Sequence, residues 1–416
     1  MSASLKFVLT FALFLGAAFA AAGEISFVGK TDKDPLTYKP GETVTFSVTC
    51  LEDGKAIDGR DLVWTLKGDD GQVSTGKAIS SASKQLVVKG SISTPGFLWL
   101  QVSAKDAKGH LLTADKYQFN GGAGVLLDQI KGFPEPADFD AFWARQKAKL
   151  AKVPMRADQV AVDCGNKDIQ CWDVKVDCVG KPVSGYLCKP KDAKAKSLPA
   201  YVYFHGYGVH SAGKVPMANA ITLNINAHGM INGQPKSFYE EQKKTTLRGY
   251  GLDPKTNEDP ETCYWNGMMM RVMRALQFVK SQPEWDGKNL IVCGGSQGGF
   301  QSLNAAGLDS DVSECRPVVP WFCDVSGFVE SKRIKSRFMP EWVHPLGYYD
   351  AANHAKRIKA TVTIDSGLGD YVCPPSGQMV MYNNIKAPKK LTFSQGRTHG
   401  YHMKDATTST LSSEGK

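Results

Sequence analysis

The chain has 416 residues, of which 42% are hydrophobic and 22% are charged. This length allows two or three globular domains, and the composition excludes a disordered or fibrous protein. The net charge is +9, but the lysines and arginines are scattered and are not interleaved with aromatic residues. Nucleic-acid-binding proteins concentrate such charge on one face, so we expect no nucleic-acid partner.

The first residues have the pattern of a cleavable secretory signal. Lys6 precedes the apolar run FVLTFALFLGAAFA, and small residues follow at Ala18 and Ala20. A basic start, an apolar middle and a small-residue end are typical of such signals. The run is short for a membrane span, and no second run approaches that length. We therefore expect residues 1–22 to be a signal peptide and the mature protein to be secreted or periplasmic, without a membrane partner.

Residues 23–120 have an all-β pattern. The segments ETVTFSVTC, DLVWTLKG, KQLVVKG and GFLWLQVSA are rich in β-forming residues, and turn sequences such as KPGE, GDDG and STPG separate them. This spacing predicts an immunoglobulin-like β-sandwich. It contains no catalytic grouping, so we expect a spacer or a carbohydrate-contacting module. The glycine-rich segment Asn120–Gly124 indicates the junction with a second domain, residues 125–416.

The second domain begins with a helical pattern and continues with alternating strands and helices. Phe139, Phe142, Trp143 and Leu150 fall near one face of a helix. Later, the strand-like segments AYVYFHG, ITLNINAHG, NLIVCGG, VVPWFCD, ATVTIDSG and KKLTFSQ alternate with helical patterns, one of them the methionine-rich GMMMRVMRALQFVK. Nearly continuous apolar strands predict an α/β fold with a mostly parallel sheet covered by helices. We expect the methionines of the helix to pack against this sheet.

Ten cysteines are compatible with disulfides in an exported protein. Cys164, Cys171, Cys178 and Cys188 lie together in strand-like sequence, so one or two disulfides are expected there, with the pairing open. Their spacing does not suit zinc, and we expect no metal.

Two glycine-rich segments are candidate sites. Gly208–Lys214 approaches the pattern of a phosphate-binding loop, but Val215 stands where serine or threonine would hold magnesium. The second segment, VCGGSQGGF, contains a G-x-S-x-G pattern centred on Ser296. A strand-like segment precedes it and a helical segment follows, which is the setting of a nucleophile on a strained turn. Gly294 and Gly298 then provide space for that turn; a plain glycine-rich turn is the alternative.

A serine nucleophile needs a base and a carboxylate that orients the base. In this type of fold both follow later strands, in the order acid, then histidine. Asp370 follows ATVTIDSG and His399 follows KKLTFSQ. Asp365 and His402 are the rivals; we prefer Asp370 because Asp365 falls inside the strand, and His399 because it comes first.

The reaction also needs two N–H groups at the developing oxyanion. One is expected from Gln297, directly after the serine, and the other from Tyr207, after the strand AYVYFHG. Nearby His205 is expected to be a buried, hydrogen-bonded histidine and not the base.

Longer segments carry a resemblance to a known family. Between Phe133 and Met403 they are PADFDAFW, FHGY, RALQFVKSQPEWDGKNLIVCGGSQGG and YYDAANHAKRIKATVTIDSGLGDYVCPPSGQMVMYN. Together they resemble the acetyl xylan esterase / cephalosporin C deacetylase family, carbohydrate esterases of the α/β-hydrolase fold. The nucleophile, acid, base and two oxyanion donors of that family match Ser296, Asp370, His399, Tyr207 and Gln297. The resemblance implies removal of acetyl groups from sugar hydroxyls without a cofactor.

The chain departs from the family pattern in two places. Ala227–Met230 stands where the family usually has Arg-Gly-Gln-Gly, and Gly400 stands where a glutamate often follows the histidine. Substrate range and oligomeric state therefore stay open. Trp321, Phe328, Trp342 and His344 all follow the end of a strand-like segment. These four residues are candidates either for contact with the sugar or for packing.

We expect a secreted serine carboxylesterase that deacetylates carbohydrates of the xylan or xylo-oligosaccharide type through an acyl-enzyme intermediate. A secreted serine peptidase of the same fold is one alternative, because that class also joins β domains to a hydrolase domain. A glycan-binding protein with an inert hydrolase domain is the other.

Overall fold

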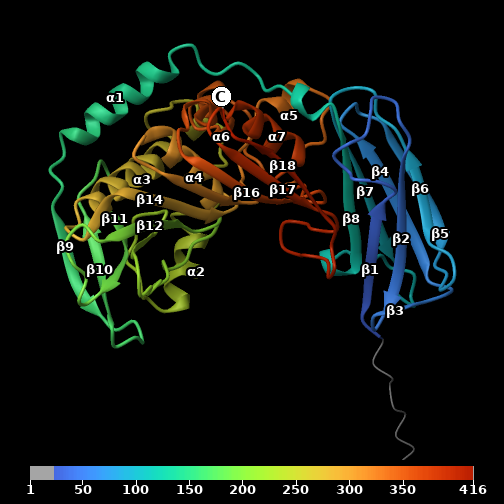
Figure 1. Ribbon diagram of the computed structural model, residues 1–416, viewed down its shortest axis with the longest axis horizontal. Helices are drawn as coiled ribbons and strands as arrows, with labels where there is room; N and C mark the ends of the chain where they lie inside the picture. Colours follow the sequence, from blue (N-terminus) through green and yellow to red (C-terminus); the bar gives the residue numbers. More distant parts are fainter. Residues whose placement is uncertain (1–22, 416) are drawn as a thin grey trace, which may run out of the picture.

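The computed structural model describes residues 23–415, so the expected signal peptide lies outside the described residues. The molecule has two parts, an N-terminal all-β unit and a larger α/β part, which together form an arch (Figure 1). No helix within residues 23–415 is long and apolar enough to cross a membrane.

The N-terminal unit consists of two four-stranded antiparallel sheets. The first contains β1 (Ile25–Thr31), β2 (Val44–Glu52), β3 (Lys55–Ala56) and β6 (Leu86–Gly90). The second contains β4 (Asp61–Gly68), β5 (Val73–Ile79), β7 (Gly96–Ala104) and β8 (Gln118–Val125). Both sheets contribute to one hydrophobic core, which includes Phe46 and Leu100. Residues of β2 alternate between buried and partly exposed, as expected for a strand with one face on a core.

The segment Asn120–Gly124 is part of strand β8 and does not form the junction that its glycines indicate. It pairs with β7 along its whole length. A Cβ atom on Gly122 would lie 2.9 Å from the carbonyl oxygens of both Leu98 and Leu368. The absence of a side chain at Gly122 lets this strand lie directly against the α/β part.

The α/β part is built on a ten-stranded sheet with the order β18-β17-β16-β15-β14-β12-β13-β11-β10-β9. Its strands are β9 (Ala157–Val162), β10 (Ile169–Val176), β11 (Val183–Pro190), β12 (Leu198–Phe204), β13 (Ile221–Ile225), β14 (Trp285–Gly295), β15 (Glu314–Val318), β16 (Thr361–Gly367), β17 (Lys389–Ser394) and β18 (Thr408–Ser413). The central strands from β17 to β13 are parallel, and the strands at both edges are antiparallel. The sheet is therefore mixed: its centre is parallel, as predicted, and its edges are antiparallel.

Helices pack on this sheet and on one another. They are α1 (Phe139–Ala151), α2 (Lys236–Lys244), α3 (Tyr264–Lys280), α4 (Gln297–Leu308), α5 (Gly327–Glu330), α6 (Ala351–His354) and α7 (Pro375–Asn384). Short 3-10 turns add η1 (Asp115–Tyr117), η2 (Leu127–Gln129), η3 (Lys255–Asn257), η4 (His344–Tyr348) and η5 (Ala355–Arg357). Helix α3 contacts the central strands and α4. Met268 and Met269 are fully buried there, so the methionine-rich face packs in the core as predicted.

The prediction of a strand at VVPWFCD is wrong. Strand β15 ends at Val318, where that segment begins. The backbone then adopts positive φ values at Val319 (40°), Phe322 (58°) and Asp324 (56°), which no strand allows. Pro320 also lacks the N–H that a ladder needs. The apolar residues of this loop are buried, and this burial explains the strand-like composition.

One disulfide links Cys171 and Cys188. The two residues lie opposite each other in neighbouring strands β10 and β11, with Cα atoms 4.1 Å apart. Cys164 and Cys178, the other two cysteines of that cluster, are free.

Candidate active site

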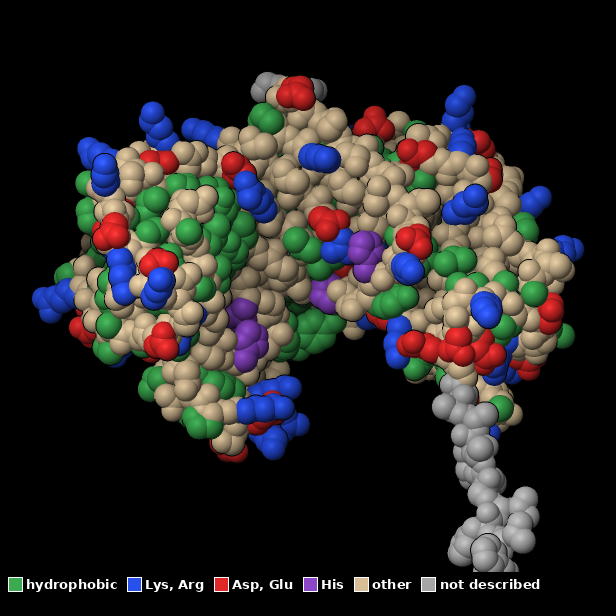
Figure 2. All heavy atoms as spheres, turned by 60° about the horizontal axis from the view of Figure 1, so that its bottom comes forward, with side chains coloured by type: hydrophobic (Ala, Val, Ile, Leu, Met, Phe, Trp, Pro, Cys, Tyr) green, Lys and Arg blue, Asp and Glu red, His purple; other side chains and the backbone are tan. Residues whose placement is uncertain are grey.

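Four parallel strands of the sheet, β12, β14, β16 and β17, end at the same edge. Ser296 follows β14, Asp370 follows β16 and His399 follows β17. The carboxyl ends of parallel strands are where α/β proteins bind ligands. Figure 2 shows that the molecule is hollowed between its two parts and that histidine side chains gather around this concave side.

Ser296 has an unusual backbone conformation at the turn from β14 into α4, with φ 56° and ψ −119°. A positive φ is costly for a residue with a side chain. Hydrogen bonds hold this conformation: the Ser296 N–H donates to the Val318 oxygen at 2.9 Å. Its carbonyl oxygen accepts from the N–H groups of Phe300 (3.0 Å) and Trp321 (3.1 Å). The serine hydroxyl is thereby lifted above the end of the sheet.

Two glycines make this turn possible. A Cβ atom on Gly298 would overlap the carbonyl oxygen of Phe204 in β12, and one on Gly294 would overlap the backbone of Gly298. Gly295 differs, because its Cβ would meet nothing closer than the Val318 oxygen at 3.8 Å. Glycine is therefore sterically required at Gly294 and Gly298, which are the two glycines of the G-x-S-x-G pattern.

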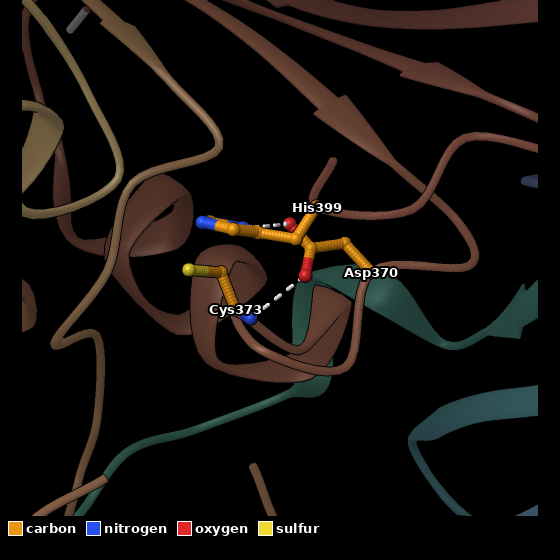
Figure 3. Close-up of side chains that lie close together, drawn as sticks. All are labelled: Asp370, Cys373 and His399. Carbon is orange, nitrogen blue, oxygen red and sulfur yellow. Dashed lines mark hydrogen bonds and ion pairs between the residues drawn. The ribbon is translucent and has the colours of Figure 1, made fainter. Parts of the chain in front are cut away.

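A chain of hydrogen bonds joins the three residues that the sequence puts forward. Ser296 Oγ lies 3.0 Å from His399 Nε2, and His399 Nδ1 lies 2.9 Å from Asp370 Oδ2. The other carboxylate oxygen accepts from the N–H groups of Val372 (3.0 Å) and Cys373 (2.9 Å). Figure 3 shows Asp370 held between the imidazole and the Cys373 backbone. Because a carboxylate only accepts, the imidazole proton lies on Nδ1, and Nε2 faces the serine hydroxyl as an acceptor.

The rival residues take other places. Asp365 forms an ion pair with Arg397. His402 is exposed, and its backbone bridges to Arg397. Neither side chain joins the hydrogen-bond chain at the serine.

Cys373 brings a thiol close to this site. Its sulfur, a carboxylate oxygen of Asp370 and a nitrogen of His399 lie within 4.8 Å of one another, a grouping that could hold a metal ion. Burial raises the pKa of the Cys373 thiol well above its usual value, which keeps it protonated. A metal would need the thiolate, and it would compete with the hydrogen bonds that already occupy Asp370 and His399. Asp370, the His399 ring and the Cys373 N–H therefore form a hydrogen-bonded cluster, with the protonated thiol beside it.

The two expected oxyanion donors lie on either side of the serine. Gln297 is the first residue of α4, so its N–H has no acceptor within the helix. Tyr207 follows β12, where a Cβ on neighbouring Gly206 would lie 3.9 Å from Ser296 Cβ. The Tyr207 ring stacks on Tyr250, with ring centroids 4.2 Å apart.

Tyr250 is a site residue that the sequence did not indicate. Its hydroxyl accepts from the Gly208 N–H at 2.9 Å and donates to Gln297 Oε1 at 2.9 Å. One hydroxyl thus joins the two segments that carry the expected oxyanion donors. Tyr250 lies in an irregular segment between α2 and α3, and no local pattern distinguishes it from other tyrosines in loops.

The segment Ala227–Met230, which lacks the family's arginine, contacts an arginine from helix α3. His228 is fully buried, and its Nε2 lies 2.8 Å from the Gly208 oxygen, while Nδ1 bonds the Tyr264 hydroxyl. Arg271 of α3 donates to the Ala227 carbonyl at 2.6 and 3.1 Å. A buried arginine therefore stands next to the segment in which the family arginine is missing.

His205 has both ring nitrogens bonded to backbone groups: Nε2 accepts from the Ala227 N–H at 3.0 Å, and Nδ1 donates to the Gly206 oxygen at 2.7 Å. Burial lowers the pKa of His205 to about 3, so the ring is neutral. The segment Gly208–Lys214 is followed by no helix, and Lys214 bonds the Asp163 carbonyl at 2.6 Å, so it does not form a phosphate-binding loop.

Of the four candidates for sugar contact, two belong to the core. Trp321 and Phe328 are buried, with 1% and 4% of their surface exposed. Trp342 is partly exposed and His344 is exposed. The packing interpretation therefore holds for the first two.

Comparison with known proteins gives one consistent result. The family model of acetyl xylan esterase (AXE1) matches residues 126–411. The acetyl esterase Axe7A of Xylanibacter ruminicola is 32% identical over 338 residues, which cover 76% of this chain and 74% of that protein.

Two solved structures of acetyl xylan esterases are also similar to this chain. An acetyl xylan esterase from Paenibacillus sp. R4 is 29% identical, with a TM-score of 0.56, over 66% of this chain and 94% of that chain. Acetyl xylan esterase 1 from Thermoanaerobacterium sp. JW/SL YS485 is 22% identical, with a TM-score of 0.53, over 67% of this chain and 93% of that chain. The second likeness concerns the fold, which is of the α/β-hydrolase type. The chain belongs to the acetyl xylan esterase family and is a carboxylic ester hydrolase that acts on acetyl esters.

Proposed function

We propose that this chain is an exported serine esterase that removes acetyl groups from carbohydrates of the xylan or xylo-oligosaccharide type. The observation that carries the mechanism is the hydrogen-bond chain from Ser296 through His399 to Asp370. The family supports an acetylated carbohydrate as the substrate. Export rests on the signal-like pattern of residues 1–22. No cofactor enters the proposed reaction.

In the first step, Ser296 attacks the carbonyl carbon of the acetyl ester while His399 Nε2 takes the hydroxyl proton. The imidazole becomes positively charged, and the buried carboxylate of Asp370 stabilises that charge and keeps the ring in position. A hydroxyl has little nucleophilicity at neutral pH, so this proton transfer is what makes the attack possible.

The carbonyl oxygen becomes an oxyanion as the tetrahedral intermediate forms. The N–H groups of Gln297 and Tyr207 are the proposed donors to it. His399 then gives its proton to the sugar oxygen, and the alcohol leaves. Water, deprotonated by the same imidazole, attacks the acetyl-serine and releases acetate.

We propose that the N-terminal unit, whose last strand β8 ends at Val125, is an immunoglobulin-like β-sandwich, and that an α/β-hydrolase domain follows it. The two antiparallel sheets of the unit, packed around a shared core, support that description.

Ser296→Ala tests the mechanism. Without the nucleophile, kcat for 4-nitrophenyl acetate should fall by at least about 10³-fold, as for other enzymes that use such a triad. His399→Ala should give a loss of similar size, whereas His402→Ala, an exposed histidine three residues further on, should keep wild-type activity. A Ser296→Ala variant with near-normal turnover would overturn the proposed mechanism.

The substrate class needs a separate measurement. Acetate release should be followed on acetylated xylan, acetylated xylo-oligosaccharides, other acetylated polysaccharides and peptides with an acetylated N-terminus. We expect turnover of the xylan-type substrates. Faster release from another polysaccharide would overturn the xylan assignment but leave the serine mechanism untouched.

A further inference from the structure

Strand β7 of the N-terminal unit is buried on both faces. Leu98 and Leu100 point into the core between the two sheets. Phe97 instead belongs to the core of the α/β part, where its ring meets Phe393 of β17 edge-to-face at 5.8 Å. Side chains alternate between the faces of a strand, so β7 has one side for each part of the molecule. We call the side of β7 and β8 that meets the α/β part the docking face; it contains Phe97, Trp99, Asn120 and Gly122.

The docking face contacts the loop that carries Asp370. The Trp99 ring stacks on Tyr371, the next residue, with centroids 4.0 Å apart and an interplanar angle of 22°. On the other side of Asp370, a Cβ on Gly369 would overlap the Asn120 backbone. The two residues flanking the acid are thus both packed against the N-terminal unit.

The N-terminal unit also contacts the loop that carries His399. Thr398, the preceding residue, donates from Oγ1 to Asp115 Oδ2 at 2.5 Å. Four residues after the histidine, Met403 enters the hydrophobic core of the N-terminal unit and is 6% exposed. Figure 1 shows this loop between β17 and β18 reaching toward the N-terminal unit. The loop is therefore fixed on both sides of His399.

A third contact joins the docking face to the end of β17. The amide of Gln395 donates to the Gly122 oxygen at 2.6 Å and accepts from the Gly122 N–H at 3.0 Å. Gln395 is fully buried, so these bonds are shielded from water. Buried polar pairs of this kind specify one geometry, because breaking them leaves unpaired groups.

We propose that the N-terminal unit is a positioning element for the reaction: its docking face holds the Asp370 loop, and Asp115 and the core of the unit hold the His399 loop, in register with Ser296. Trp99 and Asp115 are the positioning residues, and both act through neighbours of the catalytic residues, Tyr371 and Thr398. The inference rests on the proposed roles of Asp370 and His399. It replaces the expectation of a spacer or carbohydrate-contacting module, because the contacts converge on the two loops that carry Asp370 and His399.

Two pairs of substitutions in the full-length protein test the proposal. Trp99→Ala and Asp115→Ala should each lower kcat for 4-nitrophenyl acetate by about 10- to 100-fold, since ångström-scale misplacement of catalytic groups has effects of that size. KM should change much less. Trp99→Phe keeps a stacking ring and Asp115→Asn keeps an acceptor for Thr398, so both should recover most of kcat. The rate at which a fluorophosphonate labels Ser296 should follow kcat.

Leu100→Ala is the matched control, because Leu100 is the next residue of β7 after Trp99 and points to the opposite face. It should lower the melting temperature by several degrees, as a core cavity costs about 2–5 kcal/mol, and yet leave kcat near the wild-type value. Unchanged kcat in Trp99→Ala and Asp115→Ala would overturn the proposal, and so would an equal loss in Leu100→Ala. Ser296→Ala in the same assays separates this outcome from failure of the serine mechanism.

Discussion

At the scale of single residues, Tyr250 connects the two segments that carry the proposed oxyanion donors, although it lies in a loop without any recognisable motif. Its hydroxyl is the one atom that bonds both the Gly208 N–H and the Gln297 side chain. The relative placement of the two proposed oxyanion donors therefore depends on a side chain that forms no hydrogen bond with the serine or the histidine.

Tyr250→Phe removes this hydroxyl and leaves the ring that stacks on Tyr207. We expect kcat to fall about tenfold, less than the roughly 10²–10³-fold typical of losing an oxyanion donor itself, while KM changes little. Steady-state kinetics with 4-nitrophenyl acetate measure both. Tyr239→Phe is the control, because that buried hydroxyl bonds Ile231 and Gln234 instead. Equal kcat in Tyr250→Phe and wild type would contradict the bridging role.

The sequence predicts some site residues well because their backbone leaves a local trace. Ser296 needs flanking glycines, and Asp370 and His399 follow recognisable strands in a fixed order. Tyr250 and Gln395 have no such trace, because their partners are brought to them only by folding. Their side chains satisfy backbone groups far away in the chain, and a tyrosine or glutamine in a loop carries no sign of that.

At the scale of elements, the turn between β14 and α4 depends on particular glycines. A methyl group at Gly298 would overlap the Phe204 carbonyl, whereas one at Gly295 would meet nothing closer than 3.8 Å. Gly298→Ala should therefore shift the serine and lower kcat by about 100-fold, and Gly295→Ala should stay within a few-fold of wild type. Kinetics and thermal unfolding of the two variants decide this. A tolerated Gly298→Ala would show that β12 can move away from the turn.

Elements whose pattern reflects a single local cause were predicted correctly. Helices α1, α3 and α4 follow their periodic apolar residues, and β12, β14, β16 and β17 follow their apolar runs. The strand prediction for VVPWFCD was wrong because burial in a loop produces the same apolar composition as burial in a strand. Asn120–Gly124 was misread for the opposite reason: its glycines permit close packing of β8 against another part of the chain.

At the scale of the whole molecule, buried histidines link stability to pH. His354 is fully buried, with Nε2 3.0 Å from the Tyr348 carbonyl, and burial lowers its pKa to about 3. His228 is similar, with a pKa lowered to about 4 by burial. Both rings stay neutral in the folded protein at a pH where the unfolded chain, with a histidine pKa of about 6.5, binds protons. Their contribution is complete above about pH 6.5 and is lost as the pH falls toward the folded-state values.

His354→Phe should make the protein less sensitive to acid. Between pH 7 and pH 5, wild type should lose about 2 kcal/mol more of its free energy of unfolding than the variant, at about 1.4 kcal/mol per pH unit. Urea unfolding followed by tryptophan fluorescence gives the two differences. His402→Phe, at an exposed histidine, should retain the wild-type pH dependence. Identical pH dependence of His354→Phe and wild type would contradict the assignment of a neutral buried ring.

The two-sided burial of β7 has a consequence for how such proteins diverge. The family model begins to match at residue 126, directly after β8, so the docking face lies outside the segment that this model matches. The side chains that meet this face, among them Tyr371 and Gln395, lie inside the matched segment. A change at Trp99 or Gly122 therefore selects for a matching change across the boundary. An exchange of N-terminal units between relatives would have to carry those partners with it in order to keep the enzyme active.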